Sequence, residues 1–347
     1  MKVVVLGGSG FIGKRFGALY SEKFDEVILS DSKSTQLNDF ASIKRLTNGA
    51  DVLVHAAFDH GYQFNIEGMK NVIKACKANG IKKLVYLSTV SVFDPGLSGS
   101  LNENCPWSKL RDPYTAEKIK VELKLRKNLP NDLSVVILYP TIVYGLGGNW
   151  TTFALNACVG REISLPLEGN GLCNAVYVDD VAQAIYKSCV ATERNINVLI
   201  SASEPITWKE FYEGHLTFLN SLSGKNIKCT FSGSNTNGFH VKPLHNILMK
   251  LLFKTTLGGI VLPMLIMLKK LRAKQYTLVK NDFEILNFLD STDRHRVTHP
   301  LGITRTVHIS KFNADISEAA KLLSFRPEYD FKEGIDAMTG SYRRENK

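Results

Sequence analysis

Short apolar stretches rich in valine and isoleucine recur along the chain as far as Ile200, with helical patterns between them. Runs that are apolar throughout, rather than alternating, are typical of parallel strands covered on both faces. We predict strands at Val3–Leu6, Val27–Leu29, Val52–Val54, Leu84–Leu87, Val135–Leu138, Ala175–Val178 and Val198–Ile200. We predict the helices between them near Phe11–Ser21, Gln63–Ala78, Tyr114–Lys127 and Val181–Cys189. The pattern predicts an α/β fold with a doubly wound parallel sheet.

A glycine-rich turn follows the first predicted strand directly. Gly7, Gly10 and Gly13 take the first, fourth and seventh positions of the sequence GGSGFIG, within which a predicted helix opens. Glycine lets the backbone turn tightly and approach a pyrophosphate, whose charge then faces the helix N-terminus. Such a turn can also simply connect a strand to a helix. Its place between the first strand and a helix favours a Rossmann-like dinucleotide site.

Asp31 follows the second predicted strand, about 20 residues beyond the glycines. A carboxylate at this place can accept hydrogen bonds from the adenine ribose and repel a 2′-phosphate, which favours NAD over NADP. The alternative is that Asp31 caps a turn formed by residues 31–34.

A tyrosine and a lysine lie four residues apart where a helix is predicted to begin after Pro113. This spacing puts Tyr114 and Lys118 on one helix face, where the ammonium group favours a phenolate and so makes Tyr114 a usable acid or base. Such pairs are common on solvated helices. What favours a catalytic role is Ser88 and Thr89 at the end of the fourth strand, which face the crevice where cofactor and substrate meet.

Ten basic residues and no acidic ones lie between Glu213 and Asp282, and these ten equal the whole net charge of +10. A uniformly basic nucleic-acid-binding protein would not concentrate its charge in this way. Within this part, the apolar run Thr255–Leu268 would form a helix of only ~21 Å, too short to cross a bilayer core of ~30 Å. Three interpretations stay open: a buried helix, a segment lying on an anionic membrane surface, or a basic lid over an acidic substrate.

The six cysteines form no Cys-x-x-Cys pair and have no zinc-ligand spacing. This usage suits a reducing compartment, and we predict no metal site. The chain begins with a strand-like run rather than a secretory signal. We therefore predict a cytoplasmic protein, with peripheral contact at the inner membrane face through residues 247–274 as the alternative.

The order of further motifs resembles the extended short-chain dehydrogenase/reductase superfamily, of the NAD-dependent epimerase/dehydratase type. The resemblance is close over roughly residues 1–205 and weaker beyond. Besides the glycine turn and the Tyr114–Lys118 pair, it rests on Asp51–Ala57, Asn65–Gly68 with Asn71, Tyr86–Thr89, Pro140–Gly145 and Tyr177–Ala182.

The resemblance implies a role for each matching residue. The pyrophosphate of NAD would lie against Gly7, Gly10, Phe11 and Ile12, next to Gly13, and the adenine ribose against Asp31. Ala56, Ala57, Ser88 and Pro140 would lie beside the cofactor, and Lys118 would hold the nicotinamide ribose. Tyr114 would be the catalytic acid or base, with Thr89 as its hydroxyl partner on the substrate.

Three departures from the family pattern bear on this expectation. Gln36 stands where relatives usually place an adenine-contacting aspartate, and Tyr139 where an arginine commonly precedes the Pro-Thr motif. Nucleotide-sugar 4,6-dehydratases carry an Asp-Glu pair after the active-site threonine, whereas Thr89 is followed here by Val90 and Ser91. Because eliminating water needs an additional acid and base, a 4,6-dehydratase is disfavoured.

We assign residues 1–163 and 174–203 to a dinucleotide-binding domain. Residues 164–173 and 204–347 are assigned to a smaller C-terminal α/β substrate-binding unit, which contains a helix from about Trp208 to Leu219 and the basic, partly apolar segment 240–275. A length of 347 residues suits two such units.

We predict an NAD(P)-dependent oxidoreductase or epimerase that acts on a carbonyl or hydroxyl of a nucleotide-linked sugar. Arg161, Lys242 and the Lys250–Lys274 stretch would supply cations for the diphosphate. The first alternative is a membrane-associated 3β-hydroxysteroid or sterol-type dehydrogenase, since Ile247–Leu271 looks like the apolar tail of that branch. The second is a regulatory protein that only binds the dinucleotide. By family analogy we expect a homodimer.

Overall fold

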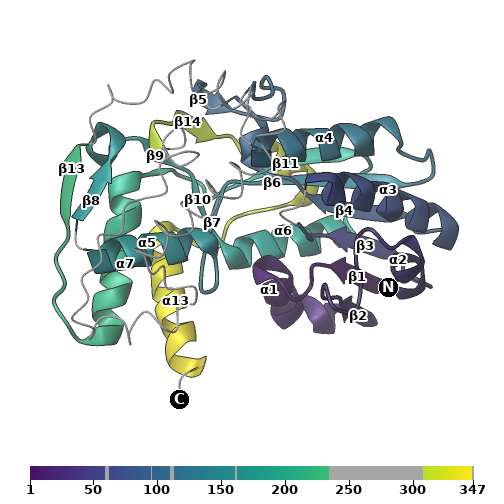
Figure 1. Cartoon of the computed structure of the whole chain (residues 1–347), viewed down its shortest axis with the longest axis horizontal. Helices are drawn as coiled ribbons and strands as arrows, with labels where there is room; N and C mark the ends of the chain where they lie inside the picture. Colours follow the sequence, from purple (N-terminus) through teal and green to yellow (C-terminus); the bar gives the residue numbers. More distant parts are fainter. Residues whose placement is uncertain (59–61, 95, 110–112, 161, 234–307, 346–347) are drawn as a thin grey trace, which may run out of the picture. The chain divides into compact units, whose positions relative to one another are not determined.

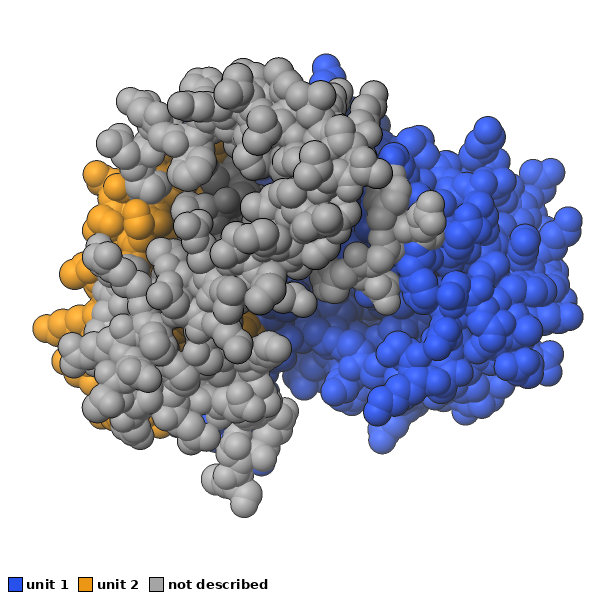
Figure 2. Space-filling model, in the orientation of Figure 1, with its two compact units in different colours: residues 1–150, 172–206, 310–347 blue, residues 151–171, 207–309 orange. Residues whose placement is uncertain are grey.

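The structure of the chain is a computed structural model (Figure 1), and it consists of two compact units (Figure 2). It describes residues 1–58, 62–94, 96–109, 113–160, 162–233 and 308–345. Unit 1 comprises Met1–Trp150, Leu172–Ile206 and Ser310–Lys347, and unit 2 comprises Thr151–Gly171 and Thr207–Ile309. The basic segment 240–275 and Arg161 lie outside the described residues.

Unit 1 is built on a six-stranded parallel sheet in the order β11-β6-β4-β3-β1-β2 (Figure 1). Its strands are β1 (Lys2–Leu6), β2 (Glu26–Leu29), β3 (Val52–His55), β4 (Lys83–Leu87), β6 (Ser134–Pro140) and β11 (Ile196–Ile200). This sheet confirms the predicted α/β, doubly wound fold. One predicted strand lies outside this sheet: β10 (Ala175–Tyr177) pairs with β7 (Ile142–Tyr144), while β11 is the strand beside β6.

Helices cover both faces of this sheet (Figure 1). Alternate residues of β1 point to opposite faces, so that Val4 and Leu6 join one core cluster while Val3 and Val5 join the other. The first cluster packs against α2 (Phe40–Leu46), α3 (Tyr62–Asn79) and α4 (Pro113–Lys127), and the second against α1 (Phe11–Tyr20), α6 (Val178–Val190) and α12 (Ser317–Leu323). Burial on both faces explains why these strands are apolar throughout.

The last described residues belong to unit 1, which differs from their sequence-based assignment to the substrate-binding unit. Strand β14 (Lys311–Ala314) pairs in parallel with β5 (Ser98–Leu101), and Phe325 is completely buried in the second core cluster. These contacts join residues far apart in the sequence. Helix α13 (Phe331–Glu345) ends the described chain, and the functional assignment of the two predicted domains stays a prediction.

Unit 2 contains most of α5 (Asn149–Gly160), together with α7 (Trp208–Ser223) and the parallel pair β8 (Glu162–Leu165) and β13 (Thr230–Gly233). Helix α7 confirms the helix predicted from Trp208, and it begins with a capping box in which Thr207 and Glu210 exchange hydrogen bonds. The remaining short elements are β9 (Leu172–Cys173), β12 (Ile206–Thr207) and the 3-10 turns η1 (Ser21–Lys23), η2 (Val90–Val92) and η3 (Pro166–Gly169).

None of the helices in the described ranges combines the length and the apolar character that crossing a membrane requires. In the same residues, we find no group of three or more His, Cys, Asp or Glu side chains placed to hold a metal ion.

Candidate active site

The glycine turn lies at the switch point of the sheet, where β1 has β2 on one side and β3 on the other. Gly7 has a φ of +83°, a conformation that other residues rarely adopt. A Cβ atom on Gly7 would lie 2.7 Å from the backbone nitrogen of Ala57, so only glycine lets the two chain segments approach. The loops after β1 and β3 therefore meet at the carboxyl edge of the sheet, where open α/β sheets bind their ligands.

Helix α1 begins at this turn, and no acidic side chain of its first turn compensates the positive end of the helix dipole. Gly10 is the N-cap residue, with no side-chain cap hydrogen bond, and the first turn contains no acidic residue. A Cβ atom on Gly13 would lie 2.3 Å from the carbonyl oxygen of Gly7, so only glycine at this position lets the helix backbone pack directly on the turn. The positive end of the helix dipole suits an anion such as a pyrophosphate. Phe11 and Ile12 form the first residues of this helix.

Asp31 caps the turn that follows β2. Its Oδ1 atom accepts hydrogen bonds from the backbone amides of Lys33 (2.9 Å) and Ser34 (2.7 Å). The hydrogen bonds from Ser34 are the main reason that the pKa of Asp31 is lowered. The turn-capping interpretation therefore holds in this structure, while binding of the adenine ribose by Asp31 stays a prediction.

Lys118 is a buried ammonium group on α4. Its Nζ atom donates a hydrogen bond of 3.1 Å to the carbonyl oxygen of Leu87, the last residue of β4. The same atom lies 4.9 Å from the ring centroid of Phe58 and 5.5 Å from that of Tyr86. Burial lowers the pKa of Lys118 to about 8, against the opposing effect of the carboxylates of Glu117 and Glu122. Lys118 is thus still largely charged at neutral pH.

Tyr114 lies one turn before Lys118 and contacts the same aromatic ring. The rings of Tyr114 and Phe58 meet edge to face, with centroids 5.1 Å apart. Phe58 follows Ala56 and Ala57 directly, so it connects the loop after β3 with both predicted catalytic residues on α4. Phe58 was not among the predicted site residues, because its position in the sequence gives no sign of this contact.

Ser88 and Thr89 follow β4, and both are buried. The Ser88 hydroxyl donates to Glu122 Oε2 at 2.9 Å, so in this structure its hydrogen bond is made to a buried side chain. The Oγ1 atom of Thr89 accepts a 3.3 Å hydrogen bond from the Ser91 amide at the start of η2. Pro140, the last residue of β6, pairs with Ile200.

The predicted site residues that the structure describes all lie in unit 1. The structure brings Gly7 and Ala57 together, and it brings Lys118 to the end of the strand that carries Ser88 and Thr89. Arg161, predicted to bind the substrate, lies outside the described residues. The roles of these residues toward cofactor and substrate remain predictions.

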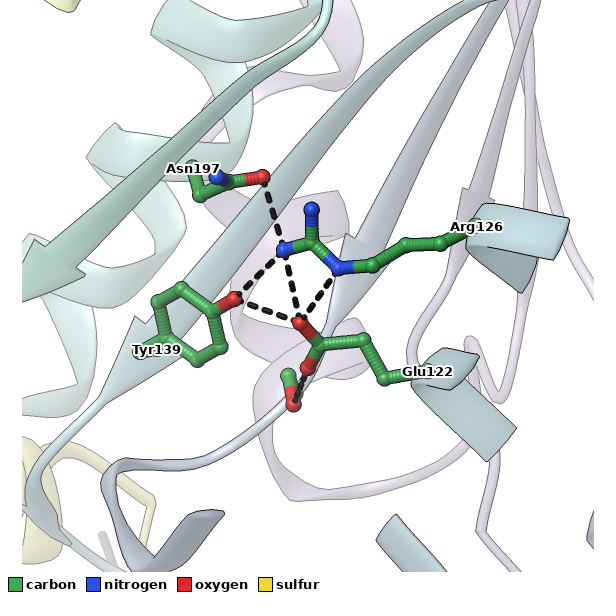
Figure 3. Close-up of polar contacts among 5 residues, drawn as sticks. Glu122, Arg126, Tyr139 and Asn197 are labelled. Carbon is green, nitrogen blue, oxygen red and sulfur yellow. Dashed lines mark hydrogen bonds and ion pairs between the residues drawn. The ribbon is translucent and has the colours of Figure 1, made fainter. Parts of the chain in front are cut away.

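Glu122 is a second residue of this region that was not among the predicted site residues. Its side chain is completely buried and binds Ser88, Arg126 and Tyr139 (Figure 3). The available signal was its spacing: Glu122 lies four residues beyond Lys118 and therefore on the same face of α4.

The sheet, the glycine turn and the Tyr-Lys helix define a dinucleotide-binding protein of the short-chain dehydrogenase/reductase type. A family model described as "NAD dependent epimerase/dehydratase family" matches residues 3–198, and the chain belongs to this family. Its curated relatives include a dehydrogenase and an epimerase, which supports an enzyme.

Curated relatives differ in the substrates that their names state. The chain is 32% identical over 165 residues to a 3beta-hydroxysteroid-dehydrogenase/decarboxylase (isoform 2) of Arabidopsis thaliana, a match covering 44% of this chain but 29% of that protein. It is 27% identical to a 2-alkyl-3-oxoalkanoate reductase of Stenotrophomonas maltophilia, covering 53% of this chain and 64% of the relative. It is 25% identical to an N-acetyl-alpha-D-glucosaminyl-diphospho-ditrans,octacis-undecaprenol 4-epimerase of Escherichia coli O157:H7, covering 64% and 77%.

Solved structures share the fold at low sequence identity. UDP-glucose 4-epimerase of Thermotoga maritima, solved with UDP-glucose, superposes with a TM-score of 0.67 at 15% identity over the full length of both chains. UDP-glucose 4-epimerase of Thermus thermophilus, solved with NAD, gives a TM-score of 0.61 at 17% identity over 99% of both chains. These likenesses establish the fold alone.

Proposed function

We propose that this chain is an NAD-dependent oxidoreductase or epimerase in which Tyr114 exchanges a proton with the substrate hydroxyl or carbonyl. The observation that carries the proposal is the arrangement of Lys118: a buried ammonium group, one helical turn from Tyr114 and bound to the end of β4 next to Ser88 and Thr89. A desolvated cation beside a phenol stabilises the phenolate, which acid–base catalysis near neutral pH requires.

The residues of the glycine turn fit a dinucleotide. The close approach at Gly7 leaves no space for a side chain, and helix α1 begins without an acidic residue in its first turn. Gly7, Gly10, Phe11, Ile12 and Gly13 would lie along the pyrophosphate. When bound, NAD supplies the acceptor or donor for a hydride. Asp31, in the turn after β2, would favour NAD over NADP.

Two side chains would contact the substrate, and a third would assist them. Thr89 would hold the reacting oxygen by a hydrogen bond, and Tyr114 would take its proton when an alcohol is oxidised or return the proton when a carbonyl is reduced. Lys118 would favour the phenolate of Tyr114 and bind the nicotinamide ribose. An epimerisation needs the same groups, used once in each direction.

For the substrate we propose a diphosphate-linked sugar. The E. coli relative, which matches 64% of this chain, is a 4-epimerase of a diphospho-linked sugar. Arg161 and the basic segment 240–275 would supply cations for the diphosphate. A 4,6-dehydratase is disfavoured because Val90 and Ser91, in η2 directly after Thr89, carry no carboxylate.

A second candidate is a membrane-associated sterol-type dehydrogenase. It is supported by the two Arabidopsis 3beta-hydroxysteroid-dehydrogenase/decarboxylase relatives, at 32% and 30% identity. Peripheral membrane contact through residues 247–274 would suit such a substrate. Membrane fractionation distinguishes the candidates. A protein that stays in the supernatant at low salt without detergent counts against the hypothesis of a membrane-associated sterol-type dehydrogenase.

Tyr114→Phe tests the chemistry. We expect NAD binding to persist and turnover to fall about 10²–10⁴-fold, because the substitution removes only the exchangeable proton. Nicotinamide absorbance or epimer formation is followed with UDP-, GDP- and dTDP-sugars and with 3β-hydroxysterols. Tyr186→Phe, a substitution in α6, is the matched control and should retain activity. Full turnover by Tyr114→Phe would refute the assignment, and NAD binding without turnover of any substrate would favour a regulatory protein.

For the proposed homodimer, α4 offers one exposed apolar side chain, Leu123, which is 52% exposed. If two copies associate through α3 and α4, Leu123→Glu should convert dimers into monomers in light scattering. A mass that does not change would place the contact elsewhere or show that none exists.

A further inference from the structure

The buried side chain of Glu122 is the centre of a polar cluster (Figure 3). Its Oε1 atom accepts hydrogen bonds from Tyr139 OH (2.6 Å), Arg126 Nη2 (2.8 Å) and Arg126 Nε (3.1 Å), and its Oε2 atom accepts the one from Ser88 Oγ (2.9 Å). Arg126 Nη2 also binds Tyr139 OH at 3.0 Å and Asn197 Oδ1 at 3.1 Å. The cluster therefore joins α4 to the strands β6 and β11 and to the residue after β4.

A fully buried carboxylate is costly unless it is paired and hydrogen-bonded. Glu122 has a guanidinium partner four residues along the same helix and two hydroxyl donors from other elements. Arg126 itself is 40% exposed, so the outer end of the pair stays in contact with water. The two hydroxyl donors, Ser88 and Tyr139, therefore each fix another part of the sheet against α4, and the arrangement allows little displacement of either.

The elements that Glu122 joins are those that carry the predicted site. Ser88 precedes Thr89, and Tyr139 precedes Pro140. Lys118, one turn before Glu122, is bound to Leu87, so α4 is attached to consecutive residues of one chain segment by an ammonium group and a carboxylate. No other described side chain binds Ser88 and Tyr139 together.

We propose that Glu122 is a positioning residue, whose buried carboxylate holds the ends of β4 and β6 on α4 and keeps Lys118, Ser88 and Pro140 in the arrangement that binds the cofactor. The inference rests on the proposed function. It assigns Glu122 no contact with the cofactor or the substrate, because it acts through Ser88, Tyr139 and the charge that it presents to Lys118.

The charge of Glu122 has an effect that a merely structural residue lacks. On α4, Lys118 has Glu117, Glu122 and Tyr114 as neighbours; from β3 and β4, His55 and Tyr86 face it. Burial, with the charge of Lys118, lowers the pKa of His55 to about 3, so this side chain is neutral. Tyr86 is neutral as well, since burial raises its pKa. The two carboxylates are thus the charges that oppose the loss of the Lys118 proton.

The experiment measures the affinity for NAD as a function of pH, by titration of the purified full chain, and needs no substrate. In the wild type, affinity should fall as pH rises above about 8, where Lys118 loses its proton. Glu122→Gln keeps the shape and removes the charge. It should weaken NAD binding about tenfold at pH 7 and move the fall to lower pH by about half a unit or more.

Two further variants separate the effect of the Glu122 charge from the effect of its hydrogen bonds. Tyr139→Phe removes one hydrogen bond but keeps the carboxylate, so the fall in affinity should stay at the wild-type pH. Glu122→Asp keeps the charge but is too short to reach Ser88 and Tyr139 together, so it should weaken binding without moving the fall. Glu122→Asp also decides the question of positioning if Glu122→Gln does not fold.

Either of two results overturns the inference alone: wild-type affinity in Glu122→Asp, or a folded Glu122→Gln variant whose NAD affinity changes with pH as in the wild type. A wild-type protein that binds no NAD at any pH would instead refute the proposed function, and this inference with it.

Discussion

At the scale of single residues, the fold places two ionisable groups in surroundings that oppose their charge. Lys118 keeps hydrogen-bond and carboxylate partners, and its pKa falls only to about 8. Asp180 on α6 is 1% exposed, and its Oδ2 atom has no hydrogen-bond partner among the described residues. Burial raises the pKa of Asp180 to about 7, although the backbone amide of Glu328 donates to its Oδ1 atom at 2.7 Å.

Asp180 gives a prediction with a defined sign. Its pKa in the folded chain lies above the value near 4 of an unfolded chain, so its contribution to stability is complete below about pH 4 and is lost as pH rises through about 7. Asp180→Asn removes the charge. In thermal unfolding we expect the variant to gain stability over the wild type between pH 4 and 7, reaching on the order of 4 kcal/mol at pH 8.

The adjacent residue is the matched control. Asp179 forms a two-point ion pair with Arg15 of α1, so Asp179→Asn should lower stability at pH 8 rather than raise it. A difference between Asp180→Asn and the wild type that does not depend on pH would contradict the burial argument.

At the scale of elements, the start of α1 tolerates little change at Gly13. In Gly13→Ala the new methyl group would meet the backbone of Gly7 and Gly8, which cannot move without opening the glycine turn. We expect this variant to lose most of its NAD affinity in a binding titration. Gly17→Ala on the same helix is the control: its methyl group meets the side-chain end of Leu29, which is 41% exposed and can turn aside.

Gly17→Ala should therefore bind NAD as the wild type does and gain up to about 1 kcal/mol from helix propensity. Equal NAD affinity in the two variants would show that the turn does not hold the cofactor.

The same scale shows what the sequence can predict. The strands of the sheet and the common helix face of Tyr114 and Lys118 could be predicted, because continuous apolar runs and the helical repeat are local patterns in the sequence. The partner of β10 and the contacts of Phe58 were not, since each depends on which distant segment occupies the neighbouring place. For Glu122 the spacing was visible, but its donor Tyr139 lies in β6 and its donor Ser88 directly after β4, and only the folded sheet brings these two segments together.

At the scale of the whole molecule, the chain leaves unit 1 and returns to it twice. The second return, after residue 309, brings β14 to β5 and Phe325 into the core beneath the sheet. The stability of the predicted dinucleotide-binding domain therefore depends on residues at the far end of the sequence, which the alternation of strands and helices did not indicate.

Phe325→Ala tests this dependence. Phe325 is completely buried with Ala319 and Leu323 against the sheet, so truncation should cost about 3–5 kcal/mol and shift urea unfolding of unit 1 to lower concentrations. Lys321→Ala on the same helix removes an exposed ion pair with Glu318 and should change stability by less than about 0.5 kcal/mol. The stabilisation against urea that bound NAD provides reports on unit 1. It should disappear at lower urea concentrations in Phe325→Ala than in the wild type. If it disappears at the same urea concentration, the stability of unit 1 does not depend on residues 310–347.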